Sequence, residues 1–143
     1  VLAAEPGDRA RLWRYREDVT ESISRSGVPV KLDVSVPLDR LAGTWAALPG
    51  TAGTRTVLFG HLAEGNVHVN LLDLAPAEET GAVDRVLRLV AGAGGSISAE
   101  HGIGRAKAPW LPLTRSAAEL AAMRAIKNAL DPTGILNPGV LLT

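Results

Sequence analysis

The sequence contains no cysteine, no long apolar run and no excess of either charge. Without cysteine the chain cannot form disulfides, thiolate nucleophiles or zinc-finger sites, and its composition fits a reducing compartment. Fifteen basic residues balance fifteen acidic residues, so the chain offers no electrostatic footprint for nucleic acid or an anionic membrane. No apolar run approaches the roughly 18 residues that a membrane-spanning helix needs. These absences leave a folded globular protein as the expectation.

The 143 residues, of which 46% are hydrophobic, suit one domain with a substantial core. The chain begins Val1-Leu2-Ala3-Ala4-Glu5, with neither a methionine nor a basic segment, which is unlike a secretory signal peptide. We therefore expect residues 1–143 to form a single domain that is one piece of a longer polypeptide.

The spacing of apolar residues predicts helices and strands that are interspersed along the chain. Residues 28–36 alternate strictly, with valines and Leu32 on one face and Lys31, Asp33 and Ser35 on the other, which predicts a half-buried strand. Two further apolar runs flank the turn-like tetrad 63–66 and predict a β-hairpin made of residues 54–62 and 67–74.

Helical spacing appears in four segments, namely residues 8–26, 38–48, 76–93 and 116–130. The glycine-rich stretch 92–104 predicts a loop with at most a short strand, and the tail 135–142 is expected to be extended. These patterns predict an α+β fold in which helices pack on one side of a sheet that contains antiparallel strands, with a ferredoxin-like tendency.

The hairpin contains two of the three histidines. If the tetrad is the turn, His61 lies directly opposite His68, with Cβ atoms about 5 Å apart on one face. Two imidazoles in that arrangement can share a metal ion. Asn70 is two residues beyond His68 and joins the same face, whereas Leu62, Val67 and Val69 should point into the core.

The third histidine lies beside a glutamate in a segment flanked by glycines, Ser98-Ala99-Glu100-His101-Gly102. A catalytic metal site typically has about three protein ligands and an open position, which makes Glu100 the natural third ligand. Neighbouring residues of an extended segment point apart, so we assign proton transfer to His101. A His, His, Glu ligand set suits Zn, Mn, Fe or Co. Each histidine could instead be only a solvated or hydrogen-bonded structural residue.

A cationic face is the second candidate site. Arg16 and Thr20 are four residues apart on a predicted helix and are therefore neighbours, and Lys31 lies on the polar face of the next strand. Together they could hold a substrate carboxylate, since Arg binds carboxylates bidentately and Lys adds a point charge. The alternative is a solvated helix surface. Lys107 and Lys127 show no comparable pattern, and we expect both to face solvent.

Three segments in order, residues 60–70, 94–104 and 131–139, make the chain similar to the C-terminal domain of FAD-linked oxidases. That family includes D-lactate dehydrogenases, the flavin subunit of glycolate oxidase and D-2-hydroxyglutarate dehydrogenases. The resemblance runs from about Leu12 to Leu141. The family usually has Gly-Asp where this chain has Ala63-Glu64, a difference that can shift the hairpin turn.

The resemblance assigns roles to residues at matching positions. It implies three metal ligands (His61, His68 and Glu100), an active-site base (His101) and four substrate contacts (Arg16, Thr20, Lys31 and Asn70). Asn137 lies in the tail that, in the family, returns toward the flavin. The resemblance also implies that FAD is bound mainly by an N-terminal domain of the same polypeptide, which this chain lacks.

The resemblance thus implies an FAD-dependent oxidoreductase that oxidises a 2-hydroxy acid to a 2-oxo acid, with a divalent metal assisting hydride transfer to flavin. We expect a cytoplasmic protein that meets a membrane, if at all, only through an electron acceptor, and we leave a homodimer open. The isolated fragment should not be active. Two alternatives remain: a module that binds a small acid or a metal without redox chemistry, and a closed metal site that only staples the hairpin to the glycine-rich loop.

Overall fold

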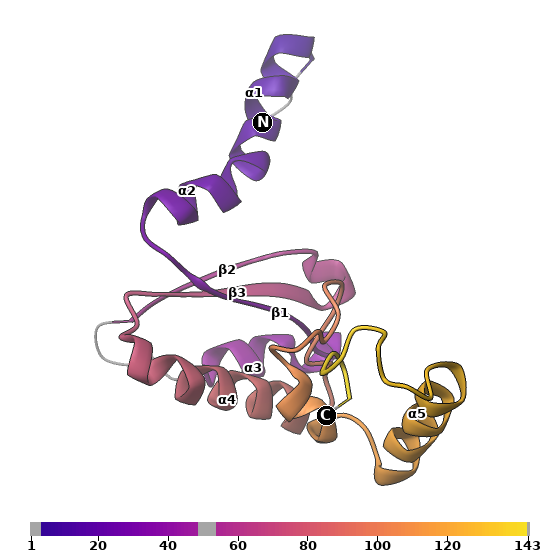
Figure 1. Cartoon of the computed structure of the whole chain (residues 1–143). Coiled ribbons are helices and arrows are strands. Elements are labelled where there is room, and N and C mark those ends of the chain that lie inside the picture. Colours follow the sequence, from indigo (N-terminus) through magenta and orange to yellow (C-terminus); the bar gives the residue numbers. More distant parts are fainter. Residues whose placement is uncertain (1–3, 49–53, 143) are drawn as a thin grey trace.

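The computed structural model describes residues 4–48 and 54–142, and Figure 1 shows their arrangement. The N-terminal half contains helices α1 and α2, strand β1, helix α3 and the hairpin strands; the C-terminal half is mainly helix and loop. The elements are α1 (Pro6–Glu17), α2 (Val19–Arg25), β1 (Val30–Ser35), η1 (Leu38–Arg40), α3 (Leu41–Ala46), β2 (Arg55–Phe59), η2 (Leu62–Glu64), β3 (Asn66–Leu72), α4 (Pro76–Gly92), η3 (Ala108–Leu113) and α5 (Ala117–Leu130).

The three strands form an antiparallel sheet in the order β1-β3-β2. Along the chain the order is strand, helix, strand, strand, helix, which is the beginning of the split βαβ arrangement. An isolated bridge between Ser35 and Ser96 extends the free edge of β1 with one further antiparallel contact. The predicted α+β fold, with an antiparallel sheet, is therefore confirmed.

The apolar face of the sheet packs against α4, and Figure 1 shows α3 and α4 on the same side of the sheet. Leu32 and Val34 of β1, with Val67 and Val69 of β3, are almost completely buried in this core. Helix α4 contributes residues at helical spacing, namely Ala82, Val86, Leu87 and Val90. The side chains of a strand alternate between its two faces, so the polar side chains lie on the face of the sheet opposite to the core.

The hairpin differs from the prediction in its register. His68 lies opposite Phe59, not opposite His61, and β2 ends at Phe59. Residues 60–65 leave the ladder, and Gly60 approaches Asn66 so closely that an added Cβ would lie 2.5 Å from its carbonyl oxygen. The 3₁₀ turn η2 then carries Leu62 outward, so its predicted burial is also wrong, and it is 53% exposed.

The predicted N-terminal helix of residues 8–26 is two helices that meet at Asp18. Helix α1 buries none of its residues and projects away from the sheet (Figure 1). Helix α2 buries Ile23, and the carbonyl oxygen of Ser26 accepts a hydrogen bond from Arg55 of β2. This anchor brings α2 to the sheet.

The C-terminal helix α5 follows its predicted boundaries, but the prediction of an extended tail is wrong, because residues 135–142 form turns and bends. Ser116 and Glu119 form a capping box at the start of α5, with reciprocal bonds between side chains and backbone. After α5, the carboxylate of Asp131 accepts the N–H groups of Ile135 and Leu136 and so fixes the start of the tail. No helix in the described ranges is both long and apolar enough to cross a membrane.

Candidate functional site

A cavity of about 250 Å³ opens on the polar face of the sheet. Its floor comes from β1 and β3, one wall from α2 and another from the segment that follows α4. The cavity is lined by Thr20, Lys31, Leu32, Phe59, His68, Asn70 and His101. Five of these residues are among those predicted to form the site, and they come from four separate segments of the chain.

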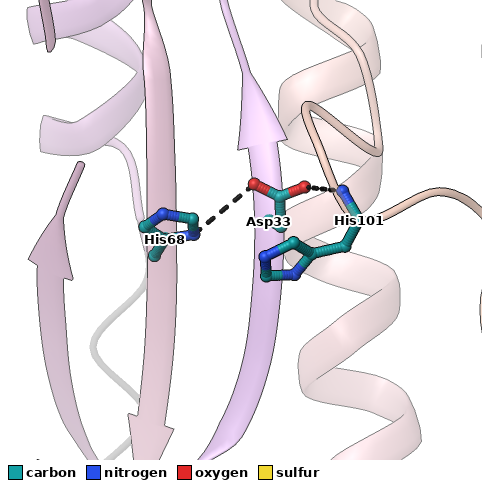
Figure 2. A group of neighbouring side chains, drawn as sticks. All are labelled: Asp33, His68 and His101. Carbon is teal, nitrogen blue, oxygen red and sulfur yellow. Dashed lines mark hydrogen bonds and ion pairs between the residues drawn. The ribbon is translucent and has the colours of Figure 1, made fainter. Parts of the chain in front are cut away.

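His68 is held between neighbours on three sides. Its ring lies 4.9 Å from the ring of Phe59, its partner on β2, and 5.5 Å from the ring of His101, nearly parallel to it. On β1 it faces Asp33, with 3.4 Å between His68 Nδ1 and Asp33 Oδ1 (Figure 2). The side chain of His68 is 20% exposed, so one edge of the ring remains accessible.

Asp33 is the charged residue at the base of this group and is only 2% exposed. Its Oδ2 accepts hydrogen bonds from the backbone N–H groups of Ala99, Glu100 and His101, at 3.1, 2.7 and 2.8 Å. Burial of the carboxyl acts to raise its pKa, but these N–H bonds and the nearby positive groups outweigh it. The pKa of Asp33 therefore lies below its ordinary value, and the carboxylate stays ionised.

A second group lies at the end of the hairpin. His61 Nδ1 is 3.3 Å from Glu100 Oε1, which also accepts a bond of 3.3 Å from the side-chain amide of Asn66. Arg16 donates to His61 Nε2 at 3.0 Å. Because an arginine can only donate, Nε2 carries the lone pair and Nδ1 of the neutral ring donates to Glu100.

Two sets of three side chains bring their donor atoms within 4.8 Å of one another in the described ranges. One set is His61, Glu64 and Glu100; the other is Asp33, His68 and His101. Of the predicted metal ligands, His61 and Glu100 are thus in contact, while His68 belongs to the neighbouring set. The two sets are joined through the backbone, since Glu100 and His101 are adjacent and point to different sets.

The donor chemistry suits a divalent transition metal. Imidazole nitrogens and carboxylate oxygens are its usual ligands, and a ligating histidine must present a lone pair. The neutral His61 already presents its lone pair to a cationic group, the guanidinium of Arg16. The side chains of His61 and Glu100 are 46% and 44% exposed, so the site is open on one side. These residues therefore fit a bound metal.

Asn70 and Asn137, the two predicted asparagines, lie in the cavity floor and in the C-terminal tail. Asn70 is 3% exposed, and its amide donates to the carbonyl oxygens of Val57 and His68, which fixes it in the floor. Asn137 lies in the exposed tail in a left-handed conformation, with φ of 47°. The neighbouring Pro138 carbonyl oxygen accepts a bond from Arg105, which ties the tail to the loop after His101.

Sequence reasoning missed the roles of Asp33, Phe59 and Lys107. The prediction that Lys107 faces solvent is wrong, because its ammonium donates to the carbonyl oxygens of Asp33 and Ile97. Burial lowers the pKa of Lys107, and the nearby Asp33 opposes that shift. The ammonium of Lys127 also donates hydrogen bonds, to the carboxylate of Asp131 and to the carbonyl oxygen of Leu136. A signal was available only for Asp33, a carboxylate in the middle of a strand rich in valine.

Several curated proteins are similar to this chain over nearly its whole length. A D-2-hydroxyglutarate dehydrogenase of Xanthomonas citri pv. viticola is 44% identical over 153 residues, which cover 99% of this chain and 32% of that protein. The mitochondrial D-2-hydroxyglutarate dehydrogenase of Bos taurus is 42% identical over 136 residues, which cover 92% and 25%. A D-2-hydroxyglutarate–pyruvate transhydrogenase of Saccharomyces cerevisiae is 36% identical over 155 residues, which cover 96% and 31%.

The chain spans about a quarter to a third of the length of these relatives. Residues 1–141 match the family described as FAD linked oxidases, C-terminal domain. The match includes the sheet, the cavity on its polar face and both groups of metal-ligating side chains. By this match the chain belongs to the C-terminal domain family of the FAD-linked oxidases.

Proposed function

We propose that this chain is the substrate- and metal-binding domain of an FAD-dependent oxidoreductase that oxidises a 2-hydroxy acid to a 2-oxo acid. The observation that carries the proposal is the cavity on the polar face of the sheet. It combines hydrogen-bond donors for a carboxylate, at Thr20 and Lys31, with the imidazole rings of His68 and His101. A small hydroxy acid offers the two groups that such a cavity recognises, a carboxylate and a hydroxyl.

The cationic residues bind the carboxylate. Lys31 and Thr20 line the cavity, whereas Arg16 is not among its lining residues and bonds to His61 at the end of the hairpin. An ammonium, a hydroxyl and a guanidinium around one anion supply both charge and orientation. Asn70, fixed in the floor by its two carbonyl partners, adds a polar contact that can orient the substrate.

His101 accepts the proton of the substrate hydroxyl. Its ring lines the cavity, its backbone is fixed by the bond to Asp33, and imidazole accepts protons near neutral pH. As the proton moves to His101, a hydride leaves the α-carbon and the 2-oxo acid is formed. His61 and Glu100, together with His68 from the neighbouring set, would hold a divalent cation that would supply Lewis acidity at the hydroxyl, and FAD would supply the hydride acceptor.

The openness of the site favours catalysis over a structural metal staple. A structural site is closed by protein ligands, whereas His61 and Glu100 are almost half exposed. The relatives named D-2-hydroxyglutarate dehydrogenase make D-2-hydroxyglutarate the first substrate to assay, followed by lactate and glycolate. The flavin-binding part would be a separate domain of the same polypeptide.

The test combines elemental analysis with steady-state kinetics on the complete flavoenzyme that contains this chain. His61→Ala, His68→Ala and Glu100→Ala should each lose metal and activity together. Glu79→Ala, on the exposed face of α4, is the matched control for Glu100→Ala and should retain both. Full metal stoichiometry in all three site variants would reject the ligand assignment.

Arg16→Ala tests the carboxylate site separately. We expect a higher KM for the hydroxy acid with a smaller change in kcat, because Arg16 binds substrate and does not take part in proton transfer. Arg11→Ala, which removes an exposed arginine from the same helix, is the control. Unchanged kinetics in Arg16→Ala would show that Arg16 belongs to a solvated helix surface.

A further inference from the structure

Asp33 occupies a position where a carboxylate needs strong compensation. It lies in the middle of β1, between the buried residues Leu32 and Val34, and is 2% exposed. A buried ionised carboxylate persists only where hydrogen bonds or opposite charges replace its hydration. The partners of its two oxygens differ, and this difference indicates what the side chain does.

The first oxygen, Oδ2, gathers three consecutive backbone N–H groups, those of Ala99, Glu100 and His101. Converging amides of this kind form an anion-binding nest. The carbonyl oxygen of Asp33 also accepts the N–H of Ala99, at 3.3 Å. The loop that carries Glu100 and His101 is therefore folded around the side chain of Asp33. This fixes the directions in which the side chains of Glu100 and His101 point.

The second oxygen, Oδ1, is buried and makes no hydrogen bond that meets normal geometry with any described residue. It is aimed at His68 Nδ1, 3.4 Å away, as Figure 2 shows. The two residues are direct partners across β1 and β3, and Phe59 closes the other side of the ring. A carboxylate in this position favours a proton on Nδ1, which leaves the lone pair on Nε2.

We propose that Asp33 is a positioning residue that sets the tautomer of His68 and holds the loop of Glu100 and His101. Its carboxylate acts through other groups and touches neither substrate nor cofactor. The inference rests on the proposed function, in which His68 and Glu100 bind the metal and His101 accepts the proton. One side chain thereby aligns all three groups.

Asp33→Asn in the complete flavoenzyme separates these two tasks. The asparagine oxygen can still accept N–H groups of the loop, so the variant should keep its circular dichroism spectrum. Its NH₂ group would face His68 Nδ1 and would require that nitrogen to accept, which moves the ring proton to Nε2. We expect the affinity for Zn²⁺ or Mn²⁺ to fall by about 10- to 100-fold, the usual effect of removing a carboxylate behind a ligating histidine.

Asp84→Asn is the matched control. Asp84 also accepts side-chain hydrogen bonds, from Arg88 and Trp110, but it lies on α4, on the other side of the sheet. This variant should bind metal as the wild type does. A folded Asp33→Asn enzyme whose metal affinity and kcat stay within twofold of those of the wild type would overturn the proposal.

A second measurement does not depend on the variant's folding. In wild-type enzyme with ¹⁵N-labelled histidine, freed of metal by a chelator, the proton of neutral His68 should reside on Nδ1. Finding it on Nε2 would overturn the proposal whatever the variants show. A wild-type enzyme that binds no metal and oxidises no hydroxy acid would instead defeat the proposed function, while the tautomer still decides the role of Asp33.

Discussion

Asp33 and Asp131 each fix a neighbouring segment through a buried carboxylate, in two different regions of the molecule. Each carboxylate is almost completely buried, at 2% and 5% exposed, and each collects N–H groups from consecutive residues. Asp33 collects them from the loop at residues 99–101, and Asp131 from residues 135 and 136 of the tail. A half-buried lysine lies beside each aspartate.

The two regions differ in where the lysine binds. Lys127 contacts the carboxylate of Asp131 directly, so that the charge is neutralised in place. Lys107 contacts the backbone carbonyl of Asp33 and leaves the carboxylate to face His68. At Asp131 this arrangement therefore holds the tail in place with a neutralised carboxylate. At Asp33 it leaves a negative charge that can interact with the imidazole of His68.

The largest expected effect is on kcat, and it distinguishes the loop that Asp33 binds from the tail that Asp131 binds. His101→Ala should lower kcat of the complete enzyme by about 10²- to 10⁴-fold, the usual contribution of a general base, while the metal content is retained. Asn137→Ala, in the segment that Asp131 holds, should mainly weaken flavin retention. Equal losses of kcat in both variants, measured under saturating substrate and flavin, would remove this distinction.

Deletion of the Asp33 carboxylate should strongly destabilise the fold. Asp33→Ala leaves the backbone N–H groups of Glu100 and His101 without their acceptor, whereas that of Ala99 keeps the carbonyl oxygen of residue 33; we expect a cost of about 3–5 kcal/mol in the free energy of unfolding. Urea titration followed by circular dichroism measures this value. Asp33→Asn, which keeps one acceptor oxygen, should recover more than half of the loss; equal destabilisation by both variants would contradict the role of the N–H bonds.

Deletion of the Asp131 carboxylate should have a smaller and more local effect. In Asp131→Ala the amides of Ile135 and Leu136 lose their acceptor and should exchange with solvent hydrogen faster, because the tail lies on the surface. Hydrogen exchange read by mass spectrometry checks this prediction. Protection of the sheet core should stay unchanged, and a loss of protection in β3 would show that the tail is coupled to the core.

The smallest expected effect concerns pH. The bond from Lys127 holds the pKa of Asp131 below its ordinary value of 3.8, with help from the tail N–H groups and against the effect of burial. Because the folded pKa is lower than the unfolded one, this stabilisation is complete above pH 3.8 and is lost as pH falls through the folded pKa. Asp131→Asn should therefore reduce the fall of the Tm in acid; identical Tm profiles would reject this contribution.

The local pattern predicted the elements because burial follows alternation and helical spacing. Leu32 and Val34 of β1, and Val86 and Val90 of α4, lie in the core where their spacing places them. Val28 is 94% exposed because it precedes the first residue that pairs with β3. Such end effects depend on hydrogen-bond partners in a distant strand, which spacing alone does not specify.

The hairpin register and the grouping of the site residues could not be predicted from the pattern. The register depends on how residues 60–65 fold; there Gly65 has φ of 74°, and an added Cβ would lie 2.1 Å from the carbonyl oxygen of Val36, so only glycine fits. The nest at Asp33 joins residues 66 to 68 positions apart in the sequence. Such contacts are set by the tertiary fold, so His61 and His68 face different neighbours although they share one hairpin.

Alternate residues of strand β1 have two different roles, in the core and on the polar face of the sheet. Leu32 and Val34 belong to the core, while Lys31 and Asp33 point to the polar face. If the proposed function holds, substitutions at position 31 should change which acids are preferred without disturbing the packing beneath. Insertion of a single residue within β1 would exchange the two faces and destroy core and pocket at once. The strand should tolerate replacement at position 31, but not at the buried Asp33 and not a change in its length.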